Sequence, residues 1–293
     1  MTKPKAPGPK PSMYLVDGDG LLYRAANAIP FFTNPAGLPT NGLHGFASMM
    51  YGLVRGSRPS HLAVGFTADP PLRKHAWDPD YKINHYEHPD EIKAQMPYAM
   101  RFVEALGGRA LLVSGYEADD IIATLVGRRK RTPVRIVSSD RDFYQLLSDD
   151  VRLVMPVRGL SEVREVGPRE VEAALGIPPA LVADLKALVG DPSDDIPGVR
   201  GIGPKTAAAL LKLFPSVEML LDHLDGVLIP GVRGKLAAMR DRILLNKRLV
   251  LPLTVELPPS LDIRLRPPDR DALAALADEA GVGVMRLART PAT

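Results

Sequence analysis

The residues best suited to chemistry in this sequence are carboxylates, which gather in four short clusters far apart along the chain. The clusters lie in the motifs VDGDG, GYEADD, SSDRD and GDPSDD, and the candidate residues are Asp17, Glu117, Asp119, Asp120, Asp140, Asp142, Asp191 and Asp194. Carboxylates brought together repel one another unless cations neutralise them. Oxygen ligands of this kind suit Mg²⁺ or Mn²⁺, and two such ions can stabilise the attacking and leaving oxygens of a phosphoryl displacement. One ion also lowers the pKa of its bound water.

Each cluster taken alone also has a purely structural interpretation. Asp119 and Asp120 stand where a helix is expected to begin, and carboxylates stabilise that end of a helix. The SSDRD motif fits a solvated turn, and the GDPSDD motif fits a cap or a turn. Acidic clusters that repeatedly follow strands, with one more before a glycine-rich turn, favour a single shared metal site.

The elements that must bring these acids together can be predicted from periodicity. Strand-length apolar runs begin at residues 13, 61, 110 and 133, and helical patterns cover residues 43–56, 95–108, 119–131 and 142–150. This alternation predicts an α/β fold with a mostly parallel central sheet flanked by helices on both faces. The carboxyl ends of parallel strands share one edge of the sheet, so we expect the acids to converge there.

The chain changes character near residue 176, where the predicted strands stop and helical patterns follow. We expect a flexible basic tail over residues 1–12, an α/β domain over 13–175, a helical region over 176–250 and an extension over 251–293 that packs on the α/β domain. Residues 196–250 hold nine Lys or Arg and four Asp or Glu, which makes this region basic. The motif IPGVRG occurs at 196–201 and again at 229–234, which suggests a duplicated hairpin.

Two segments have the composition of nucleic-acid-binding sites. In PGVRGIGPKTAAALL, closely spaced glycines precede Pro204 and Lys205, so backbone N–H groups at a helix start can approach a phosphate. A tight turn between packed helices is the alternative. Residues of about 70–95 interleave cations with rings, as segments that hold single strands do, and an ordinary surface loop is the alternative. The cations and rings of this segment are Arg73, Lys74, His75, Trp77, Tyr81, Lys82, His85, Tyr86 and His88.

Composition excludes several classes of protein. The chain has no cysteine, which excludes a disulfide scaffold, a cysteine-ligated zinc site and thiol catalysis. Hydrophobic residues make up 45% and charged residues 24%, as in folded globular proteins. No apolar run approaches the roughly 18 residues of a membrane span, and the first residues lack the apolar core of a secretory signal. We therefore expect a cytoplasmic protein that does not contact membranes.

Together these motifs resemble those of the 5′-nuclease family, which includes the 5′→3′ exonuclease domain of bacterial DNA polymerase I and the flap endonucleases. The resemblance runs in family order over roughly residues 13–250 and is carried by VDGDGLLYRA, YKIN, GYEADD, SSDRDFYQLL and LKALVGDPSDDIPGVRGIGPKTAAALL. No polymerase domain follows, so we expect a stand-alone version. The fold implied is PIN-like, with an arch at about 70–95 over the active site and a helix-hairpin-helix after it.

The resemblance also implies a function, namely a structure-specific 5′→3′ exonuclease or 5′-flap endonuclease that hydrolyses DNA with two metal ions. Asp17, Glu117, Asp119 and Asp120 match the ligands of the first ion, and Asp140, Asp142, Asp191 and Asp194 match those of the second. The expected catalytic residues are Asp17, Asp120, Asp140 and Lys82, the last of which matches the lysine that engages the scissile phosphate. The expected DNA-binding residues are Arg24, Lys74, Tyr81, Lys82, Gly198, Gly201, Gly203, Lys205 and Thr206.

The cofactors implied are two Mg²⁺ ions, with Mn²⁺ as an alternative, and a K⁺ ion held by the hairpin. The partner implied is DNA with 5′ flaps or 5′ ends, and repair or replication of DNA follows by analogy. The sequence leaves the oligomeric state open, and a monomer is the default expectation.

Three positions depart from the family pattern. The family usually has aspartate after the phenylalanine of the second strand, whereas here Thr67 follows Phe66, and Asp69 is the candidate to compensate. His85 stands in place of an arginine and Asp195 in place of an asparagine. One alternative is therefore a junction-binding protein that has lost catalysis through Thr67. Another is a ribonuclease on a similar acid-lined sheet, which would need neither the hairpin nor the arch.

Overall fold

The computed structural model of the chain describes residues 12–84 and 89–285. The expectations for the basic tail before residue 12 and for His85, Tyr86 and His88 therefore lie outside the described residues.

A six-stranded sheet forms the centre of the fold, in the order β3-β2-β1-β4-β5-β6. All neighbouring strands pair in parallel except β6, which runs antiparallel to β5. The expected α/β fold with a mostly parallel sheet is thus confirmed. The strands are β1 (Met13–Asp17), β2 (His61–Phe66), β3 (Arg109–Leu112), β4 (Val134–Val137), β5 (Val151–Arg158) and β6 (Glu162–Val166).

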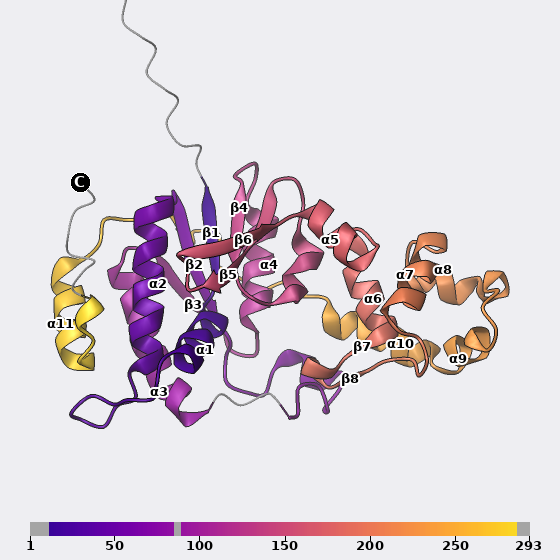
Figure 1. Cartoon of the computed structure of the whole chain (residues 1–293), viewed down its shortest axis with the longest axis horizontal. Coiled ribbons are helices and arrows are strands. Elements are labelled where there is room, and N and C mark those ends of the chain that lie inside the picture. The colour runs from indigo at the N-terminus through magenta and orange to yellow at the C-terminus, as the bar shows by residue number, and fades with distance from the viewer. Residues whose placement is uncertain (1–11, 85–88, 286–293) are drawn as a thin grey trace, which may run out of the picture.

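Helices cover both faces of this sheet (Figure 1). One apolar core lies between the sheet and the helices α1 (Gly18–Ala28), α2 (Asn41–Ser57), α3 (Asp90–Ala105) and α11 (Arg270–Ala280). A second core includes the buried side chains of α4 (Ala118–Arg128) on the other face. Burial on both faces explains why β1, β2 and β4 are almost continuously apolar.

A helical region extends from one end of the sheet, with its own apolar core (Figure 1). Its helices are α5 (Pro168–Leu175), α6 (Val182–Val189), α7 (Pro204–Leu213), α8 (Val217–Asp222), α9 (Val232–Ala238) and α10 (Arg240–Val250). The two-residue strands β7 (Gly190–Asp191) and β8 (Ile196–Pro197) pair antiparallel beside it. Short 3₁₀ helices occur at Arg73–Ala76, Arg141–Leu146, Pro179–Leu181, Pro192–Asp194 and Leu224–Gly226.

The segment after α10 returns to the α/β domain. Leu253 N–H donates to a side-chain oxygen of Asp120 at 2.6 Å, and Leu62 N–H donates to the carbonyl of Ile263 at 2.9 Å. α11 then packs beside α3, where Arg101 and Glu279 form a bidentate ion pair. The Leu253 contact thus places the start of this segment against Asp120.

One of the predicted helices is wrong, because the helix expected over residues 142–150 is a 3₁₀ helix that ends at Leu146. Within the helical region expected over 176–250, the segment 234–249 is divided at Met239 into α9 and α10. The two IPGVRG copies also fold differently, because the first forms β8 and a turn whereas the second already enters α9 at Val232. In the described part of the chain, none of the helices is both long and apolar enough to cross a membrane.

Candidate metal centre

The ends of β1 and β4 bring two of the predicted acids together. Asp17 caps α1 by accepting a hydrogen bond from Gly20 N–H at 2.8 Å. Its other oxygen accepts from the Ser138 hydroxyl at 2.7 Å, and that hydroxyl in turn accepts from Asp140 N–H at 3.0 Å. Ser138 is fully buried and was not predicted as a site residue, although it precedes Asp140 by two positions in the SSDRD motif.

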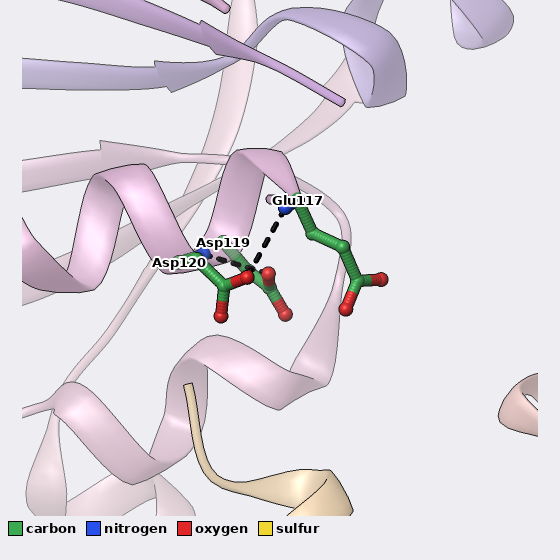
Figure 2. A group of neighbouring side chains, drawn as sticks. All are labelled: Glu117, Asp119 and Asp120. Carbon is green, nitrogen blue, oxygen red and sulfur yellow. Dashed lines mark hydrogen bonds between the residues drawn. The ribbon is translucent and has the colours of Figure 1, made fainter. Parts of the chain in front are cut away.

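A second group of acids lies at the N-cap and in the first turn of α4 (Figure 2). Glu117, Asp119 and Asp120 each offer a carboxylate oxygen within 4.8 Å of the others. Asp120 accepts a hydrogen bond from Glu117 N–H at 3.1 Å, which is a capping interaction at the start of the helix. The capping interpretation and the metal interpretation of GYEADD are therefore compatible, because the capped helix start still brings one oxygen of each carboxylate within 4.8 Å of the others.

The third group combines the SSDRD and GDPSDD motifs. Asp142, Asp191 and Asp194 offer oxygens that also lie within 4.8 Å of one another. The ammonium group of Lys186, on α6, contacts both Asp142 and Asp191. Asp191 is held further by Ser193, whose N–H donates to it at 3.1 Å.

Lys82 connects the groups. Its ammonium contacts Glu117 and lies 3.4 Å from a carboxylate oxygen of Asp194. It also borders a cavity of about 200 Å³ at the carboxyl edge of the sheet, which Asp17, Glu117, Asp119 and Asp140 line together. The predicted acids thus lie around one region, with Asp140 beside Asp17 in the cavity rather than inside the trio of Asp142, Asp191 and Asp194.

Electrostatics within the site depend on which acids face lysines. Burial opposes ionisation of Glu117, but the ammonium groups of Lys82 and Lys74 outweigh it and lower the pKa of Glu117 to about 2. Burial and the neighbouring Glu117 raise the pKa of Asp119 well above its usual range. Burial likewise raises the pKa of Asp194 to about 6. Clustered carboxylates that resist full ionisation form a donor set that suits a hard divalent cation.

Asp19 is a residue of this cavity that the sequence analysis missed. It lies in the first turn of α1, lines the cavity with Asp17, and accepts a hydrogen bond from Thr67 N–H at 2.7 Å. Burial and the charge of Asp17 raise its pKa to about 7. The sequence feature that could have identified Asp19 is the second aspartate of the VDGDG motif. Asp69, the residue expected to compensate for Thr67, is exposed and is absent from the cavity lining, so that expectation is wrong.

Lys74 and Tyr81 are placed differently from the prediction that they contact DNA. Lys74 is 2% exposed and lies 3.0 Å from an oxygen of Glu117, to which the buried Tyr81 hydroxyl also donates at 2.9 Å. Trp77 is covered by the guanidinium of Arg248, 3.6 Å from the ring centre. Because these side chains pack inward, Lys74 and Tyr81 position Glu117 in this structure and are not available for a direct contact with DNA.

Arg24 also makes contacts within the chain. Its guanidinium donates to the carbonyl of Val157 at 2.7 Å and to the Ser139 hydroxyl at 3.5 Å. It therefore lies near the end of β4 and is half-buried.

The structural reason for glycine differs among the three hairpin positions. A Cβ at Gly198 would lie 1.8 Å from the carbonyl oxygen of Val189, so glycine is required there by backbone packing. Gly201 has a φ of +85°, and a Cβ on it would lie 2.8 Å from the ammonium of Lys235. Gly203 has open space beside it.

The exposed side of the hairpin is basic. Lys205 is exposed and Thr206 half-exposed in the first turn of α7, which Pro204 begins. Lys235, which was not predicted as a site residue, reaches Gly201 from α9 and adds a second lysine to this surface.

Family models cover most of the chain. Residues 12–176 match the model described as 5′-3′ exonuclease, N-terminal resolvase-like domain, and residues 177–271 match the model described as 5′-3′ exonuclease, C-terminal SAM fold.

Curated relatives include DNA polymerase I of Mycobacterium bovis, which is 37% identical over 285 residues, or 94% of this chain and 31% of the relative. DNA polymerase I of Bacillus subtilis is 36% identical over 244 residues, or 83% of this chain and 28% of the relative. The chain thus spans about a third of the length of these relatives.

Solved structures share the fold. T5 5′-exonuclease with bound zinc has a TM-score of 0.69 and 21% identity, with 96% of this chain and 100% of that chain covered. The catalytic core of Rad2 in complex with a DNA substrate has a TM-score of 0.63 and 14% identity, with 96% and 92% covered. Human GEN1 in complex with Holliday junction DNA has a TM-score of 0.66 and 14% identity, with 93% and 68% covered.

Proposed function

The chain belongs to the 5′-3′ exonuclease family, and from this membership we propose that it is a structure-specific 5′-nuclease that hydrolyses DNA phosphodiesters at 5′ flaps or 5′ ends with two Mg²⁺ ions. Mn²⁺ is the expected substitute. The related structures with divalent metal and with DNA support this proposal. A monomer suffices, because all the carboxylates of the site come from one chain.

The single observation that carries the proposal is the gathering of the acidic groups around Lys82. This side chain contacts Glu117 of one carboxylate group and approaches Asp194 of another. Buried carboxylates at such density require compensating charge, part of which Lys74, Lys82 and Lys186 provide through ion pairs. Divalent ions, when bound, would supply further positive charge for the attacked phosphate and acidify a coordinated water.

Each group of the chain then has a defined role. The carboxylates of Asp17, Glu117, Asp119, Asp120 and Asp140 would hold the first ion, and those of Asp142, Asp191 and Asp194 the second. Ser138 fixes the positions of Asp17 and Asp140 through hydrogen bonds to both residues. Lys74 and Tyr81 fix the carboxylate of Glu117. Bound ions would neutralise Glu117 in place of Lys82. The positive charge of Lys82 would then be available to the scissile phosphate.

Duplex DNA would bind the basic surface of the helical region. Exposed Lys205 and the nearby Lys235 offer charge beside the open backbone at Gly203. This contact grips phosphates without reading bases, as a nuclease that recognises structure rather than sequence requires. We further propose that a K⁺ ion binds at this hairpin and that the protein acts in the cytoplasm, where its DNA substrate is found.

The proposal is tested with a labelled 5′-flap DNA incubated with the full chain and Mg²⁺ or Mn²⁺, beside a matched RNA flap and a metal-free control. We expect cleavage near the junction of the DNA flap, dependent on metal, and weaker cleavage of RNA. Retained flap binding without cleavage under any of these conditions would instead identify a junction-binding protein. Preferential cleavage of the RNA flap would identify a ribonuclease.

A further inference from the structure

The end of β2 carries a neutral side chain at the border of the metal centre. Thr67 follows Phe66 at the position where the resemblance leads one to expect a carboxylate. The Thr67 hydroxyl accepts a hydrogen bond from Ala118 N–H at 3.2 Å, at the start of α4. Thr67 is therefore built into the junction between β2 and α4, and the charge expected there is missing.

A different element delivers a carboxylate to the same place. Asp19 lies in the first turn of α1 and receives a hydrogen bond from Thr67 N–H at 2.7 Å. It is 7% exposed and lines the cavity together with Asp17, Thr67 and Asp119. The carboxyl group that Thr67 lacks is thus present one hydrogen bond away.

The local backbone explains why α1 comes so close to β2. A Cβ at Gly18 would lie 2.5 Å from the ring of Phe66 and 2.8 Å from the carbonyl oxygen of Gly65. Only glycine at this position allows the first turn of α1 to pack directly on the end of β2. Asp17 already serves as the cap of α1, so capping does not account for Asp19.

We propose that Asp19 is a metal-binding residue that takes the place of the carboxylate absent at Thr67, so that the charge has moved from β2 to α1. This inference rests on the proposed function. The two positions are alternatives, because a carboxylate at 67 would face Asp19 and the two like charges would repel.

A purely structural role for Asp19 does not explain its charge. Asparagine has an oxygen that could accept the Thr67 hydrogen bond equally well. A carboxylate buried beside Asp17 is costlier than an amide unless a cation compensates it. The chain nevertheless has the carboxylate, which faces a cavity that Asp17, Glu117 and Asp119 also line.

The test measures Mn²⁺ binding by isothermal titration calorimetry on the full chain and on Asp19→Asn, Thr67→Asp and the double variant, each checked by thermal unfolding without metal. Asp69→Asn is the matched control, because Asp69 is an exposed carboxylate two residues after Thr67. We expect Asp19→Asn to weaken Mn²⁺ binding roughly 10- to 100-fold. We expect Thr67→Asp to bring no gain, the double variant to regain most of the affinity, and the control to match the unaltered chain.

The outcomes separate this inference from the proposed function. If the unaltered chain binds no Mn²⁺, the proposed function fails and the inference fails with it. If the unaltered chain binds Mn²⁺ and Asp19→Asn binds it equally well, only the inference is overturned. A double variant that folds but stays as weak as Asp19→Asn also overturns it, because the two positions would then not be exchangeable.

Discussion

The ammonium group of Lys82 lies 3.4 Å from a carboxylate oxygen of Asp194 while it also contacts Glu117. These two acids belong to different carboxylate groups, one at the N-cap of α4 and one beyond α6. Lys82 itself has a φ of +54°, a conformation that is uncommon outside glycine, and its N–H donates to the carbonyl of Asp194 at 3.0 Å. Without metal, the chain thus neutralises part of the site with its own lysine.

Replacing this lysine should affect metal binding and cleavage in opposite directions. Lys82→Ala removes a positive charge that competes with cations, so we expect Mn²⁺ affinity to rise roughly fivefold to tenfold. We expect cleavage of a 5′ flap to fall about 10²-fold, because the same charge would act on the phosphate. Calorimetry and single-turnover cleavage measure the two effects. Lys212→Ala, which removes an exposed lysine of α7, is the control for metal affinity. A parallel loss of affinity and cleavage would mean that Lys82 only supports the fold.

Removing two acids of the SSDRD motif should abolish cleavage and spare DNA binding. Asp140→Asn with Asp142→Asn takes one charge from the carboxylates proposed to hold each of the two ions, so we expect metal to be no longer held. We expect no detectable cleavage of the flap substrate, but unchanged flap binding in metal-free buffer by fluorescence anisotropy. Asp149→Asn with Asp150→Asn is the matched control, because both residues are exposed and lie in the same connection to β5. Full activity of the first double variant would refute the site.

The convergence of these acids was predictable from the sequence, whereas much of their surroundings was not. Each acidic cluster follows an apolar strand or precedes a glycine-rich turn, and parallel strands place such ends at one edge. The inward position of Lys74 and Tyr81 was not predictable from local pattern. It depends on how their segment packs on α10, where Arg242 lies 2.6 Å from Asp78 and Arg248 covers Trp77.

Asp19 was missed for a related reason. The glycines of VDGDG are typical of a turn, yet α1 begins directly at Gly18. The contact with Thr67 also needs the register in which Asp17 of β1 pairs with Gly65 of β2. Register between strands so distant in sequence is a property of the assembled sheet rather than of either strand.

The hairpin lysines should contribute binding energy that does not depend on DNA sequence. For each of Lys205→Ala and Lys235→Ala, we expect weaker binding of duplex DNA and a salt slope reduced by about one, since one phosphate contact is lost. Anisotropy titrations at several KCl concentrations with two unrelated duplexes measure this. Lys130→Ala is the control, because Lys130 is exposed just after α4, near the opposite edge of the sheet. A loss seen with only one of the duplexes would contradict a phosphate contact.

Stability without metal should depend on pH through Asp19. In the folded protein the pKa of this carboxyl is raised to about 7, mainly by burial. In an unfolded chain the expected pKa is about 3.9. Between these values the folded protein keeps a proton that the unfolded chain has released. The contribution of Asp19 to stability is therefore fully present below about pH 4 and declines as the pH rises towards 7.

Asp19→Asn cannot lose such a proton, so the variant should be the more stable protein at neutral pH when metal is absent. We expect a difference in the free energy of unfolding on the order of 1 to 4 kcal/mol at pH 7.5, since one pKa unit corresponds to about 1.36 kcal/mol. The difference should shrink as the pH falls towards 4. Urea unfolding in the presence of EDTA across this range measures it, with Asp69→Asn as the exposed control. Adding Mn²⁺ at pH 7.5 should reverse the order by stabilising the unaltered chain more than the variant. A constant difference at all pH values would show that the pKa of Asp19 is the same in the folded and unfolded protein, and that burial does not raise it.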